Sequence, residues 1–119
     1  MRLLIADDSE ILRTYLANVL SRIEGVEIVG QVEDSSEAVE RLKPDVAILD
    51  IRMPKGDGTL ALETIKRSKY PPKAIILTHY PYPHYRKRCM DAGADYFFDR
   101  STEFKELADV LKELTQETS

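Results

Sequence analysis

Three aspartates stand directly after apolar runs that are typical of buried strands. Asp7 and Asp8 follow residues 3–6, and Asp50 follows residues 46–49. The carboxyl ends of neighbouring parallel strands lie at one edge of a sheet, so these carboxylates are expected to converge. Grouped carboxylates repel one another unless a cation joins them, and Mg²⁺ prefers oxygen ligands. The pattern therefore predicts a magnesium site with an aspartate able to accept a phosphoryl group.

Helix capping is the alternative interpretation of Asp7 and Asp8, because acidic residues before a helix accept hydrogen bonds from its free amides. Capping accounts for one aspartate more readily than for two in a row beside a third. Asp50 has the alternative role of a turn residue that opens the next loop. Its position after four apolar residues favours presentation at the sheet edge instead.

Strand-like apolar runs alternate with helical patterns along the whole chain. Strands are expected at 3–6, 26–32, 46–49, 74–78 and 96–98. Helices are expected after the caps Ser9, Asp34 to Ser36 and Ser101 or Thr102, and at 60–65 and 85–92. In the first helix the expected inward residues are Ile11, Leu12, Tyr15, Leu16, Val19, Leu20 and Ile23. Such alternation predicts a parallel sheet with helices on both faces.

Length and composition limit the class of protein. The 119 residues are enough for one domain, expected over 1–119. The net charge of −4 argues against a nucleic-acid-binding surface. No apolar run approaches the roughly 20 residues of a membrane span, and Cys89 is the only cysteine, so no disulfide framework is expected. We expect a cytoplasmic protein that binds neither nucleic acid nor membrane.

Several motifs together resemble the receiver domain of two-component response regulators. In chain order they are Asp7-Asp8, Leu49-Asp50-Ile51-Arg52-Met53-Pro54, Gly56-Asp57-Gly58, Leu77-Thr78 and Gly93-Ala94-Asp95-Tyr96. Each motif is weak alone, but their order and spacing are specific, and the likeness covers essentially the entire chain. The resemblance implies a single three-layer, doubly wound (βα)5 domain of the flavodoxin-like type, with a five-stranded parallel sheet in the order 2-1-3-4-5.

The resemblance also assigns the metal site and the phosphoacceptor. In such receivers a histidine kinase, or a histidine phosphotransfer protein, passes its phosphoryl group to the aspartate that matches Asp50. The acidic pair, here Asp7 and Asp8, holds Mg²⁺ with that aspartate. The backbone carbonyl of Arg52 matches the group that commonly completes the metal shell.

Two further positions match residues that respond to the phosphoryl group. Thr78 matches the hydroxyl that forms a hydrogen bond with it, and Phe97 matches the aromatic switch residue. From spacing alone, Thr78 is equally consistent with an ordinary strand residue and Phe97 with an ordinary core residue.

Three residues depart from the family's pattern. Arg100 stands where receivers have a lysine that pairs with the acceptor. A guanidinium is larger, planar and fork-shaped, so it either binds the phosphate bidentately or lies too far out, and a solvated surface arginine is the alternative. Ser101 stands where many receivers have proline. His79 follows Thr78, where small residues are common, and its ring would narrow the approach to Asp50.

An aromatic loop precedes the predicted fourth helix. Tyr80, Tyr82 and Tyr85 alternate there with Pro81 and Pro83, and such rings serve either partner contacts or simple packing. In receivers the fourth helix, fifth strand and fifth helix form the output surface. The resemblance thus implies an output domain or downstream protein as partner, and a monomer or a phosphorylation-linked homodimer.

Four functions compete for this sequence. The preferred one is a signalling switch that accepts a phosphoryl group on Asp50 and is not a turnover enzyme. The runner-up is a degenerate receiver that binds partners regardless of phosphorylation, because of Arg100. A haloacid-dehalogenase-type phosphatase needs a general acid where Arg52 stands, and a flavin carrier needs a phosphate loop where Asp7 and Asp8 would repel phosphate.

Overall fold

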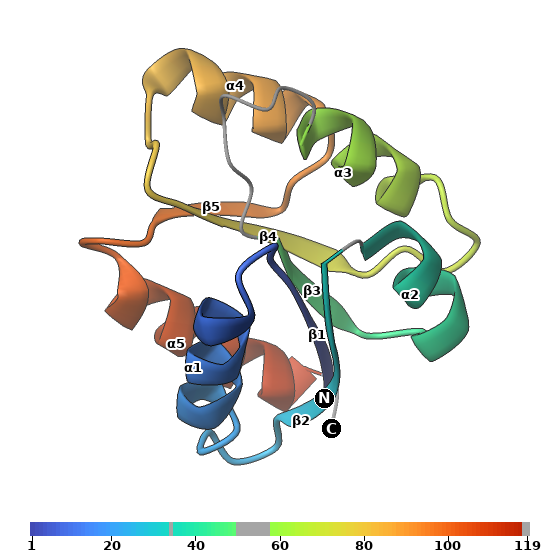
Figure 1. Ribbon diagram of the computed structural model, residues 1–119, viewed down its shortest axis with the longest axis vertical. Helices are drawn as coiled ribbons and strands as arrows, with labels where there is room; N and C mark the ends of the chain where they lie inside the picture. Colours follow the sequence, from blue (N-terminus) through green and yellow to red (C-terminus); the bar gives the residue numbers. More distant parts are fainter. Residues whose placement is uncertain (34, 50–57, 118–119) are drawn as a thin grey trace.

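The computed structural model in Figure 1 describes residues 1–33, 35–49 and 58–117. Strands and helices alternate through these residues. The strands are β1 (Arg2–Ala6), β2 (Glu27–Val32), β3 (Val46–Leu49), β4 (Lys73–Thr78) and β5 (Tyr96–Asp99). The helices are α1 (Glu10–Leu20), α2 (Ser35–Leu42), α3 (Gly58–Lys66), α4 (Pro83–Asp91) and α5 (Phe104–Glu117). The predicted order of elements is confirmed.

The five strands form one parallel sheet in the order β2-β1-β3-β4-β5. Helices α1 and α5 cover one face of this sheet, and α2, α3 and α4 cover the other (Figure 1). The fold is therefore the three-layer, doubly wound arrangement that the sequence predicted. In such a sheet the functional crevice lies outside the carboxyl ends of the strands, where the strand order reverses. Here that point lies between β1 and β3.

The strand register brings the predicted site residues toward one edge. Ala6 pairs with Leu49 across β1 and β3, and Leu49 pairs with Ile76 across β3 and β4. Thr78 pairs with Asp99 at the end of β4 and β5. The carboxyl ends of β1, β3, β4 and β5 therefore lie at the same edge of the sheet.

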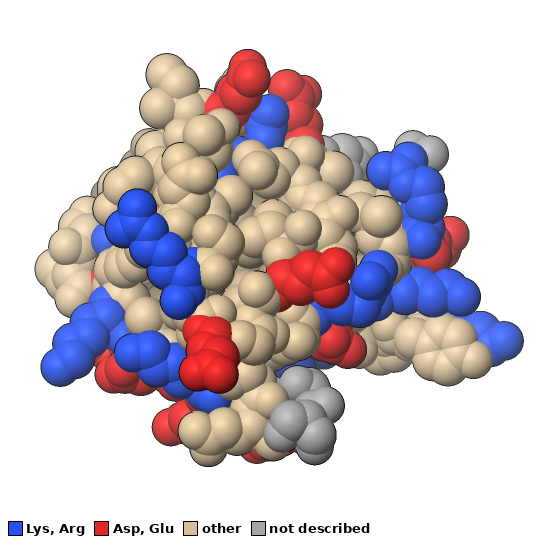
Figure 2. All heavy atoms as spheres, turned by 90° about the horizontal axis from the view of Figure 1, so that it is seen from below, with Lys and Arg blue, Asp and Glu red and all other residues tan. Residues whose placement is uncertain are grey.

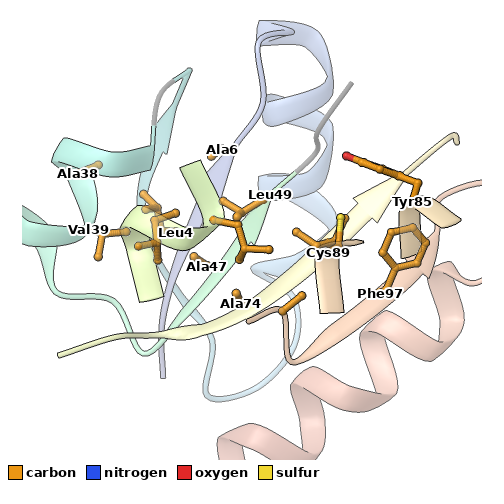
Figure 3. Packing of buried hydrophobic residues seen from close by; sticks show 14 residues of the cluster. Leu4, Ala6, Ala38, Val39, Ala47, Leu49, Ala74, Tyr85, Cys89 and Phe97 are labelled. Carbon is orange, nitrogen blue, oxygen red and sulfur yellow. The ribbon is translucent and has the colours of Figure 1, made fainter. Parts of the chain in front are cut away.

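Two apolar layers hold the helices on the sheet. Strand β3 is buried at all four positions, which explains why its sequence is apolar without alternation. Toward α2, α3 and α4 the layer includes Leu4, Val39, Leu49, Tyr85, Cys89 and Phe97 (Figure 3). Toward α1 and α5 it includes Leu3, Ile5, Leu16, Leu20, Ile48, Leu107 and Leu111. Each fully buried Leu or Ile side chain contributes about 1.5–3 kcal/mol relative to exposure.

The first helix differs from the sequence prediction in its end and in its inward face. The Ser9 hydroxyl accepts a hydrogen bond from the Leu12 amide at 3.3 Å, which confirms the predicted cap. The helix ends at Leu20, before Ile23, which the prediction placed in it. The prediction that Ile11 and Tyr15 point inward is wrong, because these side chains are 81% and 55% exposed. The buried stripe of α1 consists of Leu16, Ala17 and Leu20.

The start of the last helix also differs from the prediction. Ser101 and Thr102 are not its cap, because α5 begins at Phe104. The Asp99 carboxylate accepts a hydrogen bond from the Ser101 amide at 2.8 Å, and Glu103 donates its amide to the Asp99 carbonyl at 2.8 Å. A side chain that bonds an amide two residues onward favours a turn over a helix. Residues 99–103 therefore form a turn before the helix.

The remaining helix boundaries follow the local signals. α4 begins at Pro83, where a missing amide costs nothing, and Gly93 follows its end with a φ of 112°. α2 begins at Ser35, and the cap candidate Asp34 lies outside the described residues. Across 1–33, 35–49 and 58–117, none of the helices has the length and apolarity required to cross a bilayer.

Candidate functional site

Asp7 is the best-defined residue of the predicted acidic group. Its side chain is 3% exposed, and its Oδ1 accepts a hydrogen bond from the Ser9 amide at 3.0 Å. Its Oδ2 is buried and has no hydrogen-bond partner in the described structure. A buried carboxylate oxygen without a partner is destabilising unless a cation compensates it. The capping alternative thus explains one oxygen of Asp7 and leaves the other unexplained.

Arg13 lies beside this acidic group, and the sequence analysis did not single it out. Its guanidinium reaches back from α1 to the carbonyl oxygen of Asp7, at 2.5 Å. Arg13 is the only basic residue in α1, and it lies four residues before the buried Ala17. That spacing puts both residues on one stripe of the helix. A lone cation on a buried stripe is the signal that would have predicted this contact.

Asp8 is exposed at the same strand end, which suits a ligand that shares a metal with water molecules. The two other predicted ligands, Asp50 and Arg52, lie outside the described residues. Within the ranges that the structure describes, no group of three acidic, histidine or cysteine side chains forms a metal cluster. The buried Asp7 Oδ2 and the neighbouring Asp8 carboxylate are nevertheless hard oxygen donors of the kind that fits Mg²⁺.

Thr78 ends β4 and is completely buried. Its Oγ1 accepts a hydrogen bond from the Tyr80 amide at 3.0 Å, so the side chain is oriented toward the loop that follows. Thr78 is therefore oriented by the backbone at the end of β4.

Arg100 is held close to Thr78 through the backbone. Its amide donates to the Thr78 carbonyl at 2.8 Å, and the residue is half-buried directly after β5. A second contact joins the same two loops, because the His79 Nδ1 lies 3.3 Å from the Ser101 hydroxyl oxygen. Two of the residues that depart from the family's pattern, His79 and Ser101, therefore contact each other beside Thr78 and Arg100.

Phe97 lies in the layer between the sheet and α4. It is 3% exposed, and its ring meets that of Tyr85 edge-on, with centroids 5.9 Å apart. The Arg86 guanidinium lies 5.5 Å from the centre of the Phe97 ring. Cys89 packs in the same layer (Figure 3), and its burial raises the pKa of the thiol above the ordinary value. Phe97 therefore has the contacts of a core residue together with one charged neighbour from α4.

A family model described as the response regulator receiver domain matches residues 3–112. The chain belongs to this family. Its curated relatives include the uncharacterized transcriptional regulatory protein YvfU of Bacillus subtilis, which is 34% identical over 94% of this chain and 58% of its own length. The response regulator GacA of Pseudomonas aeruginosa is 29% identical over 96% of this chain and 55% of its own length. The chain thus spans about half the length of these relatives.

Solved receiver structures agree with the fold. The isolated receiver domain of RcsB from Salmonella enterica, in the presence of the phosphomimetic BeF3⁻, has a TM-score of 0.82 and 29% identity, and covers 98% of this chain and 88% of that one. The receiver domain of the putative response regulator NarL from Mycobacterium tuberculosis has a TM-score of 0.84 over 97% of this chain and 95% of that one. At 24% identity, this second likeness concerns the fold alone.

Membership in the receiver family carries general consequences. Receiver domains generally depend on Mg²⁺, interact with histidine kinases or phosphotransfer proteins and with output domains, and act mostly as signalling switches. The aromatic loop of this receiver has both a buried and an exposed tyrosine. Tyr85 is 1% exposed and packs in the core, whereas Tyr82 is 50% exposed.

Proposed function

We propose that this receiver is a cytoplasmic signalling switch that accepts a phosphoryl group on Asp50. The donor is a histidine kinase or a histidine phosphotransfer protein. Asp7, Asp8, Asp50 and the carbonyl of Arg52 hold Mg²⁺. The phosphorylated state is relayed to an output domain or a downstream protein through the face made by α4, β5 and α5.

One bond forms and one breaks in the proposed transfer. A carboxylate oxygen of Asp50 bonds to phosphorus, and the bond between phosphorus and the donor's histidine nitrogen breaks, with the electron pair returning to the imidazole. When bound, Mg²⁺ offsets the negative charge that otherwise repels an incoming phosphoryl group. The chain then has at most autocatalytic phosphotransfer and slow self-dephosphorylation, and no turnover chemistry on other substrates.

The observation that carries the proposal is the pairing of Ala6 with Leu49. These residues directly precede Asp7 and Asp50, so the register of β1 and β3 supports a site that includes both carboxylates. The buried Asp7 Oδ2 without a hydrogen-bond partner in the described structure supports a cation there.

Thr78 and Arg100 are the proposed phosphoryl-binding residues. The Arg100 amide donates to the Thr78 carbonyl at 2.8 Å, so the two residues lie next to each other at the edge where Asp50 is proposed to act. Phosphate adds charge and acceptor oxygens, which draw both groups inward. Phe97 is the proposed switch residue, and its ring contacts the α4 side chains Tyr85 and Arg86.

The runner-up is a degenerate receiver that binds its partner regardless of phosphorylation. Arg100 in the lysine position favours it, because a guanidinium does not fit a tight site made for an ammonium. The contact between His79 and Ser101 at 3.3 Å favours it too, since it joins the two loops beside that site. Partner binding that ignores the phosphorylation state would support this reading.

Phosphorylation by a small acyl phosphate tests the proposal. We expect the purified chain, incubated with Mg²⁺ and acetyl phosphate, to gain one phosphoryl mass by intact mass spectrometry. The Asp50→Asn variant should gain none, because an amide oxygen is a poor nucleophile and binds Mg²⁺ weakly.

Asp109→Asn is the matched control, since Asp109 is exposed on α5 and its loss removes the same charge. It should gain the phosphoryl mass as the native chain does. An equal gain by Asp50→Asn, or no gain by the native chain, would contradict the proposal.

A further inference from the structure

Residues 79–90 carry a charge opposite to that of the chain as a whole. They include Arg86, Lys87 and Arg88 and no acidic residue, whereas the chain has 21 Asp and Glu and a net charge of −4. By contrast, the face seen in Figure 2 carries acidic and basic side chains interspersed. A basic segment on an acidic protein attracts anionic partners to one place.

The exposed side of α4 has the composition of a binding surface. Arg86 and Met90 lie four residues apart on one side of α4, and Tyr82, the extended N-cap residue four positions before Arg86, lies at the start of the helix. All three are exposed, Tyr82 at 50% and Met90 at 39%, whereas Tyr85 and Cys89 form the buried stripe. Tyr, Arg and Met are the residue types enriched at the core of protein interfaces. We call these three residues the α4 stripe.

The aromatic end of the α4 stripe is held rigidly. Pro81 and Pro83 flank Tyr82 and fix the backbone on both sides. The Tyr82 ring stacks on that of His84, with an interplanar angle of 6° and centroids 6.1 Å apart. A ring that is already ordered loses little conformational entropy when a partner covers it. An exposed, pre-ordered tyrosine is therefore suited to anchor a partner.

The charged member of the α4 stripe contacts the proposed switch residue. The Arg86 guanidinium lies 5.5 Å from the centre of the Phe97 ring, and its Nη1 donates to the Phe97 carbonyl at 3.5 Å, a long hydrogen bond. A partner carboxylate would compete with these weak contacts, because a charge-assisted hydrogen bond is stronger. Binding at Arg86 would thus change the surroundings of Phe97.

We infer that the α4 stripe binds an acidic segment of a partner protein, with apolar side chains on Tyr82 and Met90 and a carboxylate on Arg86. Arg86 then couples partner binding to Phe97. The coupling rests on the proposed phosphorylation switch, whereas the binding of an acidic segment does not. Reciprocity requires that phosphorylation and partner binding strengthen each other by the same factor.

Charge argues for an acidic peptide rather than a nucleic acid. Lys87 is already paired with Asp91 at 2.9 Å, which leaves few cations of this segment for a row of phosphates. The net charge of −4 repels a polyanion at longer range. A short acidic peptide needs only one or two charge contacts, and its apolar side chains can pack against the exposed Tyr82 ring as well.

Fluorescence anisotropy with a labelled peptide tests the inference. The probe is a ten-residue peptide in which Asp and Glu alternate with Leu and Phe. The comparison probes are the same peptide with Asn and Gln, and a ten-nucleotide oligouridine. We expect saturable binding of the acidic peptide, with Kd raised about tenfold for the neutral peptide, and about fivefold or more for Arg86→Gln and for Tyr82→Ala.

Arg67→Gln is the matched control, because Arg67 is an exposed arginine paired with Glu63 on α3. It should bind the acidic peptide as the native chain does. Equal weakening by Arg67→Gln and Arg86→Gln would show a non-specific charge effect and overturn the inference. Tighter binding of oligouridine, or equal binding of the neutral peptide, would overturn it too. Circular dichroism of each variant excludes loss of the fold as the cause.

The two proposals fail separately. If the chain gains the phosphoryl mass but does not bind the acidic peptide, the proposed function holds and the binding of an acidic segment is contradicted. If the chain binds the peptide but gains no phosphoryl mass, the proposed binding surface holds and the proposed phosphorylation switch is contradicted. If both hold, acetyl phosphate should lower the Kd of the peptide for the native chain, and Arg86→Gln should reduce that factor. An unchanged factor in Arg86→Gln would overturn the coupling role.

Discussion

At the scale of single residues, the environment of Asp7 distinguishes a metal-binding role from a helix-capping role. Its Oδ1 has the hydrogen bond of a turn, to the Ser9 amide, whereas its buried Oδ2 has none in the described structure. Arg13 contributes a positive charge nearby, but its contact is with the backbone carbonyl of Asp7. One oxygen of the Asp7 carboxylate is therefore without a hydrogen bond in the described residues, which supports the proposed cation site.

Arg100 decides between a responsive and a degenerate receiver. Its amide donates to the Thr78 carbonyl at 2.8 Å, so its side chain starts next to Thr78, the other proposed phosphoryl-binding residue. We expect Arg100→Ala to slow phosphorylation by acetyl phosphate about tenfold or more, the loss of roughly 1.4 kcal/mol of electrostatic stabilisation. Arg100→Lys should stay within about threefold of the native rate, because it keeps the charge.

Initial rates of phosphoryl incorporation at fixed Mg²⁺ provide the measurement, with Arg22→Ala as control for the loss of one surface charge. An unaffected rate in Arg100→Ala would show that Arg100 is solvated and takes no part. A rate in Arg100→Lys far above the native one would show instead that the guanidinium blunts the switch.

At the scale of elements, short polar side chains and turns determine the shape of the loops that carry the proposed site. The turn at 99–103 displaces the start of α5 to Phe104, and thereby keeps Ser101 within reach of His79 at 3.3 Å. Local hydrogen bonds that the Asp99 carboxylate and carbonyl accept fix that turn. The loops beside Thr78 and Arg100 are thus shaped by polar contacts, whereas the helices are held by apolar ones.

Gly93 offers a test of how α4 is joined to β5. Its φ is 112°, and a Cβ there would lie 2.9 Å from the Lys66 Cγ. Lys66 is itself held by Asp95 at 2.9 Å and by the Pro72 carbonyl at 3.0 Å. We expect Gly93→Ala to lower the free energy of unfolding by about 1–3 kcal/mol, from backbone strain and the displaced lysine.

Urea unfolding followed by circular dichroism measures this change. Ala92→Gly is the comparison, since Ala92 lies next to Gly93 with a φ of −79°. Its loss of stability should be smaller, about 0.5–1 kcal/mol. A Gly93→Ala variant as stable as the native chain would show that Lys66 and the backbone adjust without cost.

At the scale of the whole molecule, the proposed metal site joins strands that are distant in sequence, so Mg²⁺ should stabilise the entire fold. At ten times its Kd, a ligand that binds only the native state adds about 1.4 kcal/mol to the free energy of unfolding. We expect this gain in the native chain and its loss in Asp7→Asn. Thermal unfolding with Mg²⁺ and with chelator measures it without any phosphoryl donor.

Asp109→Asn, on the exposed side of α5, should keep the gain because it lies outside the proposed metal site. A magnesium-dependent gain of the same size in Asp7→Asn would remove Asp7 from the metal ligands. The chain spans about half the length of the curated relatives cited above, so the output that follows these events is a property of the larger assembly.

The sequence alone determined the order of elements and the sheet. Continuous apolar runs such as 46–49 are long enough and uniform enough to specify strands buried on both faces. The alternation with helices then predicts a parallel sheet whose crossover connections are right-handed. The acidic strand ends were also predicted, because side-chain type and position after a strand are local properties of the chain.

Only the tertiary structure decided how individual side chains are used. Ile11 and Tyr15 are apolar but exposed, since the sheet covers a narrower stripe of α1 than its sequence offers. The contacts of Arg13 with Asp7 and of Arg86 with Phe97 depend on where a helix packs against a strand end. Local periodicity specifies elements, but the burial and partner of each side chain follow from how those elements meet in space.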